Sequence, residues 1–183
     1  MPHRFHAEQW LPYPSELVFA FFANPENLPR LMPPWQQVRI EEGSFAPPPP
    51  RPLDSPRFPG IVAGNGSRIL ISARALPRIP ARGGWEALIE DFRWNEGFCD
   101  IQLRGPFKSW RHCHSVKPEP GPDGRPGTRV TDDITYELPL GPLGALANLL
   151  IARRALAYAF RIRQERTLPL LARAAQSAGT RFA

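Results

Sequence analysis

Apolar and polar side chains alternate with a period of two through most of residues 67–138. Alternation of this kind predicts strands with one buried face, because successive side chains of a strand point to opposite sides of a sheet. Clusters of glycine, proline and asparagine divide the region, as is typical of turns. The pattern predicts an antiparallel meander of strands at residues 67–75, 85–94, 98–104, 109–117 and 128–138.

The N-terminal part of the chain alternates less regularly. Residues 4–10 are predicted to form an opening strand, and residues 37–42 another. Between these strands, the apolar run at residues 16–22 predicts a short helix with Ser15 as a candidate N-cap. Residues 25–31 are predicted to add a second short helical turn.

Near the C-terminus the apolar spacing lengthens to three or four residues, which predicts an amphipathic helix. The apolar arc of this helix consists of Leu146, Leu149, Leu150, Leu156, Ala157 and Phe160. Pro169 is predicted to end or kink the helix, because proline lacks the N–H that a helix interior requires. Residues 177–183 are predicted to be a frayed tail.

A length of 183 residues fits one domain, so we predict a single unit over residues 1–183. The 24 prolines lie mainly between the strand-like runs and are interpreted as loop residues. Residues 45–60, which include four consecutive prolines, are predicted to be an extended surface connection. A polyproline ligand for a partner protein is the alternative for this segment.

The net charge of +6 and the isoelectric point near 10.1 raise the question of nucleic-acid binding. Because the arginines are scattered and lysine occurs only at Lys108 and Lys117, we predict no specific nucleic-acid site. A basic surface would still favour transient contact with an anionic membrane.

Cys99 and Cys113 lack metal-ligand spacing, and the sequence shows no signal-peptide pattern. We therefore predict free thiols in a reducing cytoplasm, with a disulfide as the less favoured alternative. No metal and no cofactor are expected. No apolar run approaches the roughly 18 residues of a membrane span.

Four stretches carry a family pattern: residues 14–25 (PSELVFAFFANP), 98–107 (FCDIQLRGPF), 110–114 (WRHCH) and 128–142 (TRVTDDITYELPLGP). Together with the terminal helix, they resemble the START-like superfamily, also called SRPBCC, in its cyclase/dehydrase or coenzyme Q-binding branch. The resemblance implies an α+β helix-grip fold, in which a curved antiparallel β-sheet wraps around a long C-terminal α-helix, with two short helices after the first strand.

The resemblance also implies a hydrophobic cavity between sheet and helix, which across the superfamily holds lipids, sterols, polyketides, quinones or hormones. It implies no reaction, because one fold supports many functions. Candidate site residues must therefore come from this sequence. Strand alternation predicts that the cavity face carries Trp110, His112, His114, Asp132 and Tyr136.

A symmetric pairing of the strands at residues 98–104 and 109–117 would place Asp100 opposite His114. The same register places Gln102 opposite His112, and Asp132 would lie on the other side of His114. A row of Asp100, His114 and Asp132 would hold the histidine protonated and oriented. Such a row could serve acid–base catalysis, bind a polar ligand group or simply form a hydrogen-bonded patch. A metal site formed with both histidines is the least favoured interpretation.

Arg153 falls inside the apolar arc of the C-terminal helix, together with Gln164. The arginines outside the arc are Arg154, Arg161, Arg163 and Arg166. An arginine that faces a cavity needs a partner, so we predict that Arg153 pairs with Asp132 or with an anionic or carbonyl group of the ligand. The alternative is that its side chain extends to the pocket mouth.

The leading hypothesis is a protein that binds or carries a small hydrophobic molecule. The predicted ligand contacts are Trp110, His112, His114, Gln102, Asp132, Tyr136, Arg153 and Phe160. The first alternative is a polyketide cyclase-like or hydrolase-like enzyme that uses His114 with Asp100 or Asp132. The second is a scaffold that binds a protein partner through residues 45–60.

Overall fold

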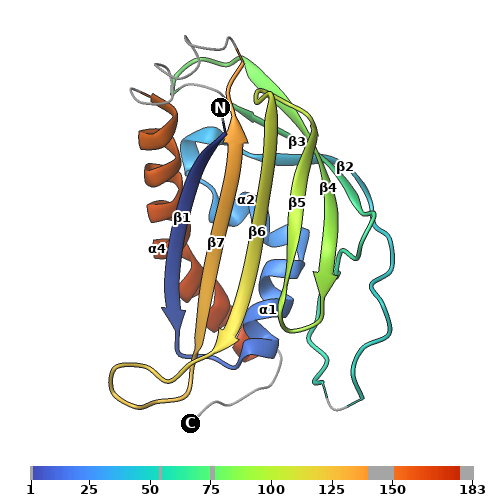
Figure 1. The fold of residues 1–183 in the computed structure, drawn as a ribbon, viewed down its shortest axis with the longest axis vertical. Helices are drawn as coiled ribbons and strands as arrows, with labels where there is room; N and C mark the ends of the chain where they lie inside the picture. The colour runs from blue at the N-terminus through green and yellow to red at the C-terminus, as the bar shows by residue number, and fades with distance from the viewer. Residues whose placement is uncertain (1, 54, 75–76, 140–150, 178–183) are drawn as a thin grey trace.

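The computed structural model describes residues 2–53, 55–74, 77–139 and 151–177. Its strands form one antiparallel sheet in the order β1-β7-β6-β5-β4-β3-β2, and the helices lie on one face of that sheet, behind it in Figure 1. The meander is therefore continuous, and the N-terminal strand pairs with its last strand. This arrangement confirms the predicted α+β fold.

All predicted strands are confirmed, with ends that differ by at most three residues. The strands are β1 (His3–Leu11), β2 (Arg39–Ser44), β3 (Arg68–Arg74), β4 (Arg82–Arg93), β5 (Gly97–Arg104), β6 (Ser109–Pro118) and β7 (Thr128–Glu137). Burial alternates residue by residue along β6 and β7 as the sequence predicts. The face toward the helices is buried because it packs against them, whereas the outer face meets solvent.

The helical elements are α1 (Ser15–Ala23), η1 (Pro25–Asn27), α2 (Leu28–Leu31), η2 (Pro34–Gln36) and α4 (Arg153–Ser177). The two predicted short helical segments are confirmed. Ser15 is the first residue of α1 rather than its cap, and its hydroxyl donates to the Glu16 carboxylate at 3.3 Å.

The long helix α4 continues past Pro169 to Ser177, so the prediction that this proline ends the helix is wrong. Pro169 and Glu165 both lie on the exposed side of α4, where water can reach the Glu165 carbonyl that lacks an amide partner. The arc residues Leu146, Leu149 and Leu150 and nearly all of the predicted tail lie outside the described residues.

Two apolar clusters lie between the sheet and the helices. The packed cluster joins α1, α2 and the last turns of α4 to the sheet, and its buried members include Leu17, Phe19, Leu31, Val130 and Leu171. The aromatic cluster lies beneath the first described turns of α4 and contains Trp110, Ile134, Tyr136 and Phe160, with Phe5, Trp85, Phe107 and Leu156 at its partly buried rim.

The proline-rich residues 45–60 form an irregular, largely exposed connection between β2 and β3, as predicted. Trp94 holds this connection in place, because its indole N–H donates to the Pro49 carbonyl at 2.8 Å. The guanidinium of Arg51 lies over the same ring, 4.2 Å from its centroid. The scaffold alternative for this segment stays a prediction.

The β5–β6 pairing differs from the predicted register by two residues. Cys99 lies directly opposite Cys113, and the two residues form a disulfide, so the prediction of free thiols is wrong. Gln102 explains the shift: its side-chain amide donates to the Phe107 carbonyl at 2.8 Å and accepts from the Phe107 N–H at 3.2 Å. These bonds order a turn centred closer to β5. A two-residue shift preserves the face of each side chain and changes only its partner.

Candidate functional site

Five ionisable side chains from the sheet and α4 meet at the junction of the two apolar clusters. This ionic cluster consists of Asp100 on β5, His112 and His114 on β6, Asp132 on β7 and Arg163 on α4. His114 contacts Phe98 of the packed cluster, and His112 contacts Phe160 of the aromatic cluster.

The strand register determines the order of the ionic cluster. Asp100 lies opposite His112, and Asp132 lies opposite His114. The predicted Asp132–His114 pairing is therefore confirmed, whereas the pairings of Asp100 with His114 and of Gln102 with His112 are wrong. Because the shift is two residues, Asp100 stays on the inner face and still approaches both histidines.

Each histidine lies between the two carboxylates. His112 Nδ1 is 3.2 Å from Asp100 Oδ2, and His112 Nε2 is 3.0 Å from Asp132 Oδ1. His114 Nδ1 is 2.6 Å from the same Asp132 oxygen, and His114 Nε2 is 3.7 Å from Asp100 Oδ2. The two imidazole centroids are 3.9 Å apart.

Arg163 supplies the fixed positive charge of the ionic cluster. One guanidinium nitrogen lies 3.7 Å from Asp132 Oδ1 and 3.3 Å from His114 Nδ1. The guanidinium also lies over the rings of Phe22 and Phe160, 5.0 Å and 5.5 Å from their centroids. Aromatic faces on this side favour a cation that is otherwise out of water.

Asp100 is the most accessible member of the ionic cluster. Its side chain is 19% exposed, compared with 7% for those of His112 and Asp132. The Trp110 indole N–H donates to Asp100 Oδ1 at 3.3 Å, so this carboxylate links the ionic cluster to the aromatic cluster. A molecule that enters from the aromatic side would reach Asp100 first.

The charges of the ionic cluster shift the pKa values of its members. Burial would raise the pKa of Asp132, but Arg163 and His114 outweigh burial and hold that pKa well below its usual range. The pKa of Asp100 is lowered in the same way, since both histidines outweigh its burial. Burial would lower the pKa of His112, but Asp100 and Asp132 raise it. The raised pKa of His112 favours its imidazolium form, whose charge together with that of Arg163 would balance the two carboxylates.

Arg163, not Arg153, is the arginine that reaches Asp132, so the predicted Arg153–Asp132 pair is wrong. Arg153 is exposed at the start of α4. The buried stripe of α4 consists of Phe160, Arg163, Thr167, Leu171 and Ala175. Three of the six predicted arc residues lie before residue 151, outside the described residues, and Arg163 fell just beyond the edge of the arc that the other residues defined. The spacing of the stripe beyond Phe160 was the signal that would have identified Arg163.

The predicted ligand contacts Trp110, Tyr136 and Phe160 all belong to the aromatic cluster. Their rings contact neighbouring aromatic rings: Trp110 lies 4.9 Å from both Trp85 and Phe107, and Phe160 lies 5.0 Å from Phe5. Gln102 lies at the β5–β6 turn. The cluster is therefore both aromatic and open at its rim, since Trp85, Phe107 and Phe5 are only partly buried.

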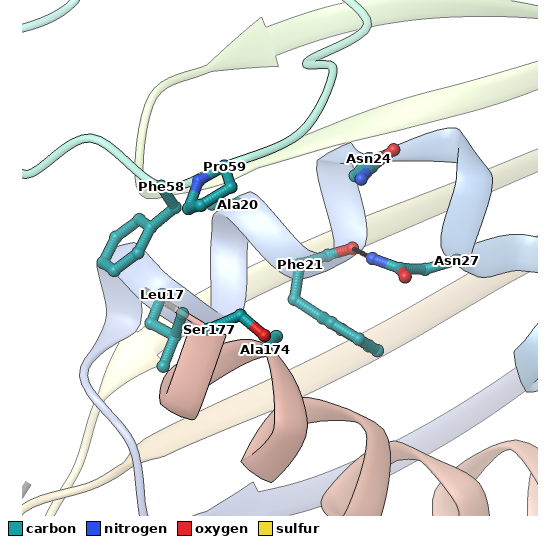
Figure 2. A pocket seen from close by; sticks show the side chains of 9 residues that line it. All are labelled: Leu17, Ala20, Phe21, Asn24, Asn27, Phe58, Pro59, Ala174 and Ser177. Atoms are coloured by element: carbon teal, nitrogen blue, oxygen red, sulfur yellow. Dashed lines mark hydrogen bonds between the residues drawn. The ribbon is translucent and has the colours of Figure 1, made fainter. Parts of the chain in front are cut away.

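A separate hollow of about 130 Å³ lies among α1, Phe58, Pro59 and the last turns of α4 (Figure 2). Asn27 borders it and donates its side-chain N–H to the Phe21 carbonyl at 2.8 Å. The hollow contains none of the predicted site residues, and it is smaller than the roughly 300–1,000 Å³ typical of ligand pockets.

A curved antiparallel sheet, two short helical segments after its first strand and a long C-terminal helix across one face define the helix-grip fold of START-like proteins. The chain belongs to the family described as polyketide cyclase/dehydrase and lipid transport, whose model matches residues 11–159. The predicted superfamily is thereby confirmed.

Solved structures with the same fold cover nearly the whole chain. TTHA0849 from Thermus thermophilus has a TM-score of 0.61 and 19% identity, and the match covers 90% of this chain and 97% of that one. Ara h 8.0201 has a TM-score of 0.54 and 14% identity, with coverages of 91% and 98%. A START superfamily protein from Mycobacterium smegmatis has a TM-score of 0.54 and 16% identity, with coverages of 90% and 97%. At these identities the likeness shows the fold alone.

No curated protein matches the chain. Among the helices in the described part of the chain, none has both the length and the apolar character needed to cross a membrane.

Proposed function

We propose that the protein binds a small, largely apolar molecule at the aromatic cluster, between the sheet and the first described turns of α4. The observation that supports this proposal most strongly is the uneven burial of side chains along α4. In residues 153–159 of the helix no side chain is fully buried, whereas buried residues recur at every turn from Phe160 to Ala175. The family, described by cyclase/dehydrase activity and lipid transport, supports a ligand of this class.

Binding at the aromatic cluster requires that its rings separate, because they contact one another. The half-buried positions of Phe5, Trp85 and Phe107 favour this, since their displacement exposes less new apolar surface than displacement of a fully buried ring. An apolar ligand would replace the lost ring contacts with its own. The bound molecule would thus fill the space that its entry opens.

The ionic cluster gives the proposed ligand a polar end. Trp110 belongs to the aromatic cluster and also donates to Asp100, so a ligand that lies along Trp110 would bring a polar group to Asp100 and His112. A buried polar group needs such a partner. We infer an amphiphilic ligand with a single polar or charged end.

The geometry favours binding over turnover. His114, the candidate catalytic residue of the enzyme alternative, has a side chain only 8% exposed and stacks within 16° of the plane of Phe22. A general base must come within hydrogen-bond distance of its substrate. His114 lies on the side of the packed cluster, farther from the proposed entry than Asp100. The enzyme alternative stays a prediction.

The proposal is tested by native mass spectrometry of protein purified from its producing cells, followed by organic extraction of bound molecules. We expect a bound amphiphile in stoichiometric amount. In parallel, the apolar dye anilinonaphthalene sulfonate is titrated into the extracted protein, with Phe160→Ala and the matched control Leu168→Ala. Phe160→Ala should change dye affinity about tenfold, which corresponds to roughly 1.4 kcal/mol, whereas Leu168, exposed on the same helix, should have no effect. Equal effects of the two changes, or a dye that the folded protein does not bind, would contradict the proposal.

A further inference from the structure

The two histidines of the ionic cluster share one hydrogen-bond acceptor, and this sharing determines where their lone pairs point. Asp132 Oδ1 lies 3.0 Å from His112 Nε2 and 2.6 Å from His114 Nδ1. The same oxygen lies 3.7 Å from a guanidinium nitrogen of Arg163, and a carboxylate beside a guanidinium accepts hydrogen bonds and donates none. We therefore assign the protons to His112 Nε2 and His114 Nδ1.

Arg163 also approaches His114 Nδ1, but under this assignment it donates no hydrogen bond to that nitrogen. Its guanidinium nitrogen is 3.3 Å from His114 Nδ1, but the shorter 2.6 Å contact of that nitrogen is with Asp132. Arg163 then directs its own hydrogen toward Asp132 Oδ1, 3.7 Å away. Its positive charge lies on the Nδ1 side of His114, behind the ring as seen from Asp100.

The remaining ring nitrogens, His112 Nδ1 and His114 Nε2, face Asp100. They lie 3.2 Å and 3.7 Å from Asp100 Oδ2, and the three ligand atoms are all within 4.8 Å of one another. Two nitrogen lone pairs and a carboxylate oxygen repel one another unless a positive charge lies among them. Either a proton on His112 or a metal ion can supply that charge.

We propose that Asp100, His112 and His114 form a site for a divalent transition-metal ion. Nitrogen and carboxylate ligands about 2.0–2.1 Å from Zn²⁺ in tetrahedral geometry are about 3.3 Å apart, close to the two separations from Asp100. Imidazole and carboxylate together select a transition metal rather than Mg²⁺ or Ca²⁺. The site includes Asp100 and His112, which the proposed function assigns to the polar end of the ligand, but metal binding does not depend on the apolar contacts of that ligand.

The surroundings of the three ligands are those of a metal site. Metal-bound histidines donate their second N–H to a carboxylate or carbonyl, and Asp132 accepts from both histidines here. Bound carboxylates are themselves hydrogen-bonded, and Trp110 donates to the outer oxygen of Asp100. A divalent ion, two carboxylates and Arg163 sum to one positive charge. One anionic oxygen at the open coordination position would neutralise the site.

The test uses the untagged full-length chain after chelator treatment, with Zn²⁺ and Co²⁺ as probes. Calorimetric titration should show saturable binding of one Zn²⁺ per chain, and the ion should raise the melting temperature. Bound Co²⁺ should give the intense visible bands of a four-coordinate nitrogen and oxygen site. The Co²⁺ spectrum of the wild-type chain keeps the test informative even where a variant folds poorly.

Single substitutions test which residues bind the metal ion. Asp100→Asn and His114→Gln should each weaken Zn²⁺ binding at least about 100-fold, and Asp132→Asn about 10- to 100-fold. The control is His6→Asn, since His6 is an exposed histidine 2.7 Å from Asp133 and should not contribute. If the folded wild-type chain shows no saturable binding of Zn²⁺, the proposal is overturned, and a proton on His112 supplies the positive charge instead. Binding that is lost in His6→Asn but kept in Asp100→Asn would overturn it as well.

Discussion

The two ends of the space between the sheet and α4 differ in how their apolar residues are covered. At one end, α1, α2 and the last turns of α4 enclose the packed cluster, and Leu171 has no exposed surface. At the other end, the early turns of α4 alone cover the aromatic cluster among the described residues, and its rim is half-exposed. The ionic cluster separates the two. The difference supports the proposal that the aromatic cluster, rather than the packed cluster, binds the ligand.

Substitution of two leucines on α4, one at each end, tests this difference most directly. Leu171→Ala should lower the free energy of unfolding by about 4 kcal/mol, because it leaves a cavity at a site enclosed on all sides. Leu156→Ala, at the partly buried rim of the aromatic cluster, should lower it by only about 1 kcal/mol. Urea denaturation of both variants measures the two values. Equal losses would mean that both ends are packed alike.

Arg163 tests whether the ionic cluster belongs to the stable part of the molecule. Arg163→Met keeps an apolar stem but leaves Asp132 without its fixed positive partner, and it should lower the free energy of unfolding by about 3 kcal/mol. Arg161→Met removes a largely exposed arginine two residues away and should change stability by less than about 0.5 kcal/mol. Thermal and urea unfolding of the pair check this prediction. A loss below about 1 kcal/mol for Arg163→Met would show that Asp132 is satisfied by the histidines alone.

The Cys99–Cys113 disulfide links the two strands that position Asp100 and the histidines. It closes a sequence separation of 14 residues, so its removal by Cys99→Ser with Cys113→Ser should lower stability by about 2–3 kcal/mol. Reduction of the wild-type chain should have a similar effect. Unchanged urea midpoints under oxidising and reducing conditions would contradict the presence of the bond in solution.

The pH dependence of stability should have a maximum in the metal-free protein. The pKa values of Asp100 and Asp132 are lowered in the folded chain, so their contribution is present above the ordinary carboxyl range and is lost as pH falls below about 4. The pKa of His112 is raised, so its contribution is present below about pH 6.5 and is lost as pH rises through the folded value. We expect the highest stability between about pH 5 and 6.

Urea titrations from pH 3 to 8 measure this profile. At each end of the pH range, the free energy of unfolding should be about 1 kcal/mol below its maximum. Asp100→Asn should flatten the profile on both sides of its maximum. The change removes a carboxyl group whose pKa is lowered, and it removes one of the charges that raise the pKa of His112. Stability that rises steadily from pH 5 to 8 would contradict the assignment of His112 as an imidazolium.

The sequence predicted the fold well because the faces of the strands are set by a local, period-two pattern. The inward positions of His112, His114 and Asp132 followed from that pattern alone. The cross-strand partners of these residues could not be predicted in the same way, because the register of β5 and β6 depends on the turn between them. The pattern of alternation does not reveal the hydrogen bonds that Gln102 makes to Phe107 in that turn. The same two-residue shift brought Cys99 opposite Cys113.

Arg163 was missed for a different reason. A helical wheel fixes relative angles along a helix, but which side faces the sheet depends on where the helix contacts its neighbours. Two hydrogen bonds between α4 and β1 fix that orientation. The side-chain amide of Gln164 on α4 donates to the Glu8 carbonyl on β1 at 2.9 Å, and the side-chain amide of Gln9 on β1 donates to the Gln164 carbonyl at 2.9 Å. Such tertiary bonds cannot be derived from the apolar spacing of α4.

Hydrogen–deuterium exchange with and without anilinonaphthalene sulfonate tests the central claim, that the aromatic end binds the apolar molecule. The account predicts that the dye slows exchange in peptides that contain residues 153–160 and 107–112, with no change in residues 171–177. Protection confined to residues 17–27 and 171–177, which flank the small hollow of Figure 2, would contradict it and place the binding site at the packed end.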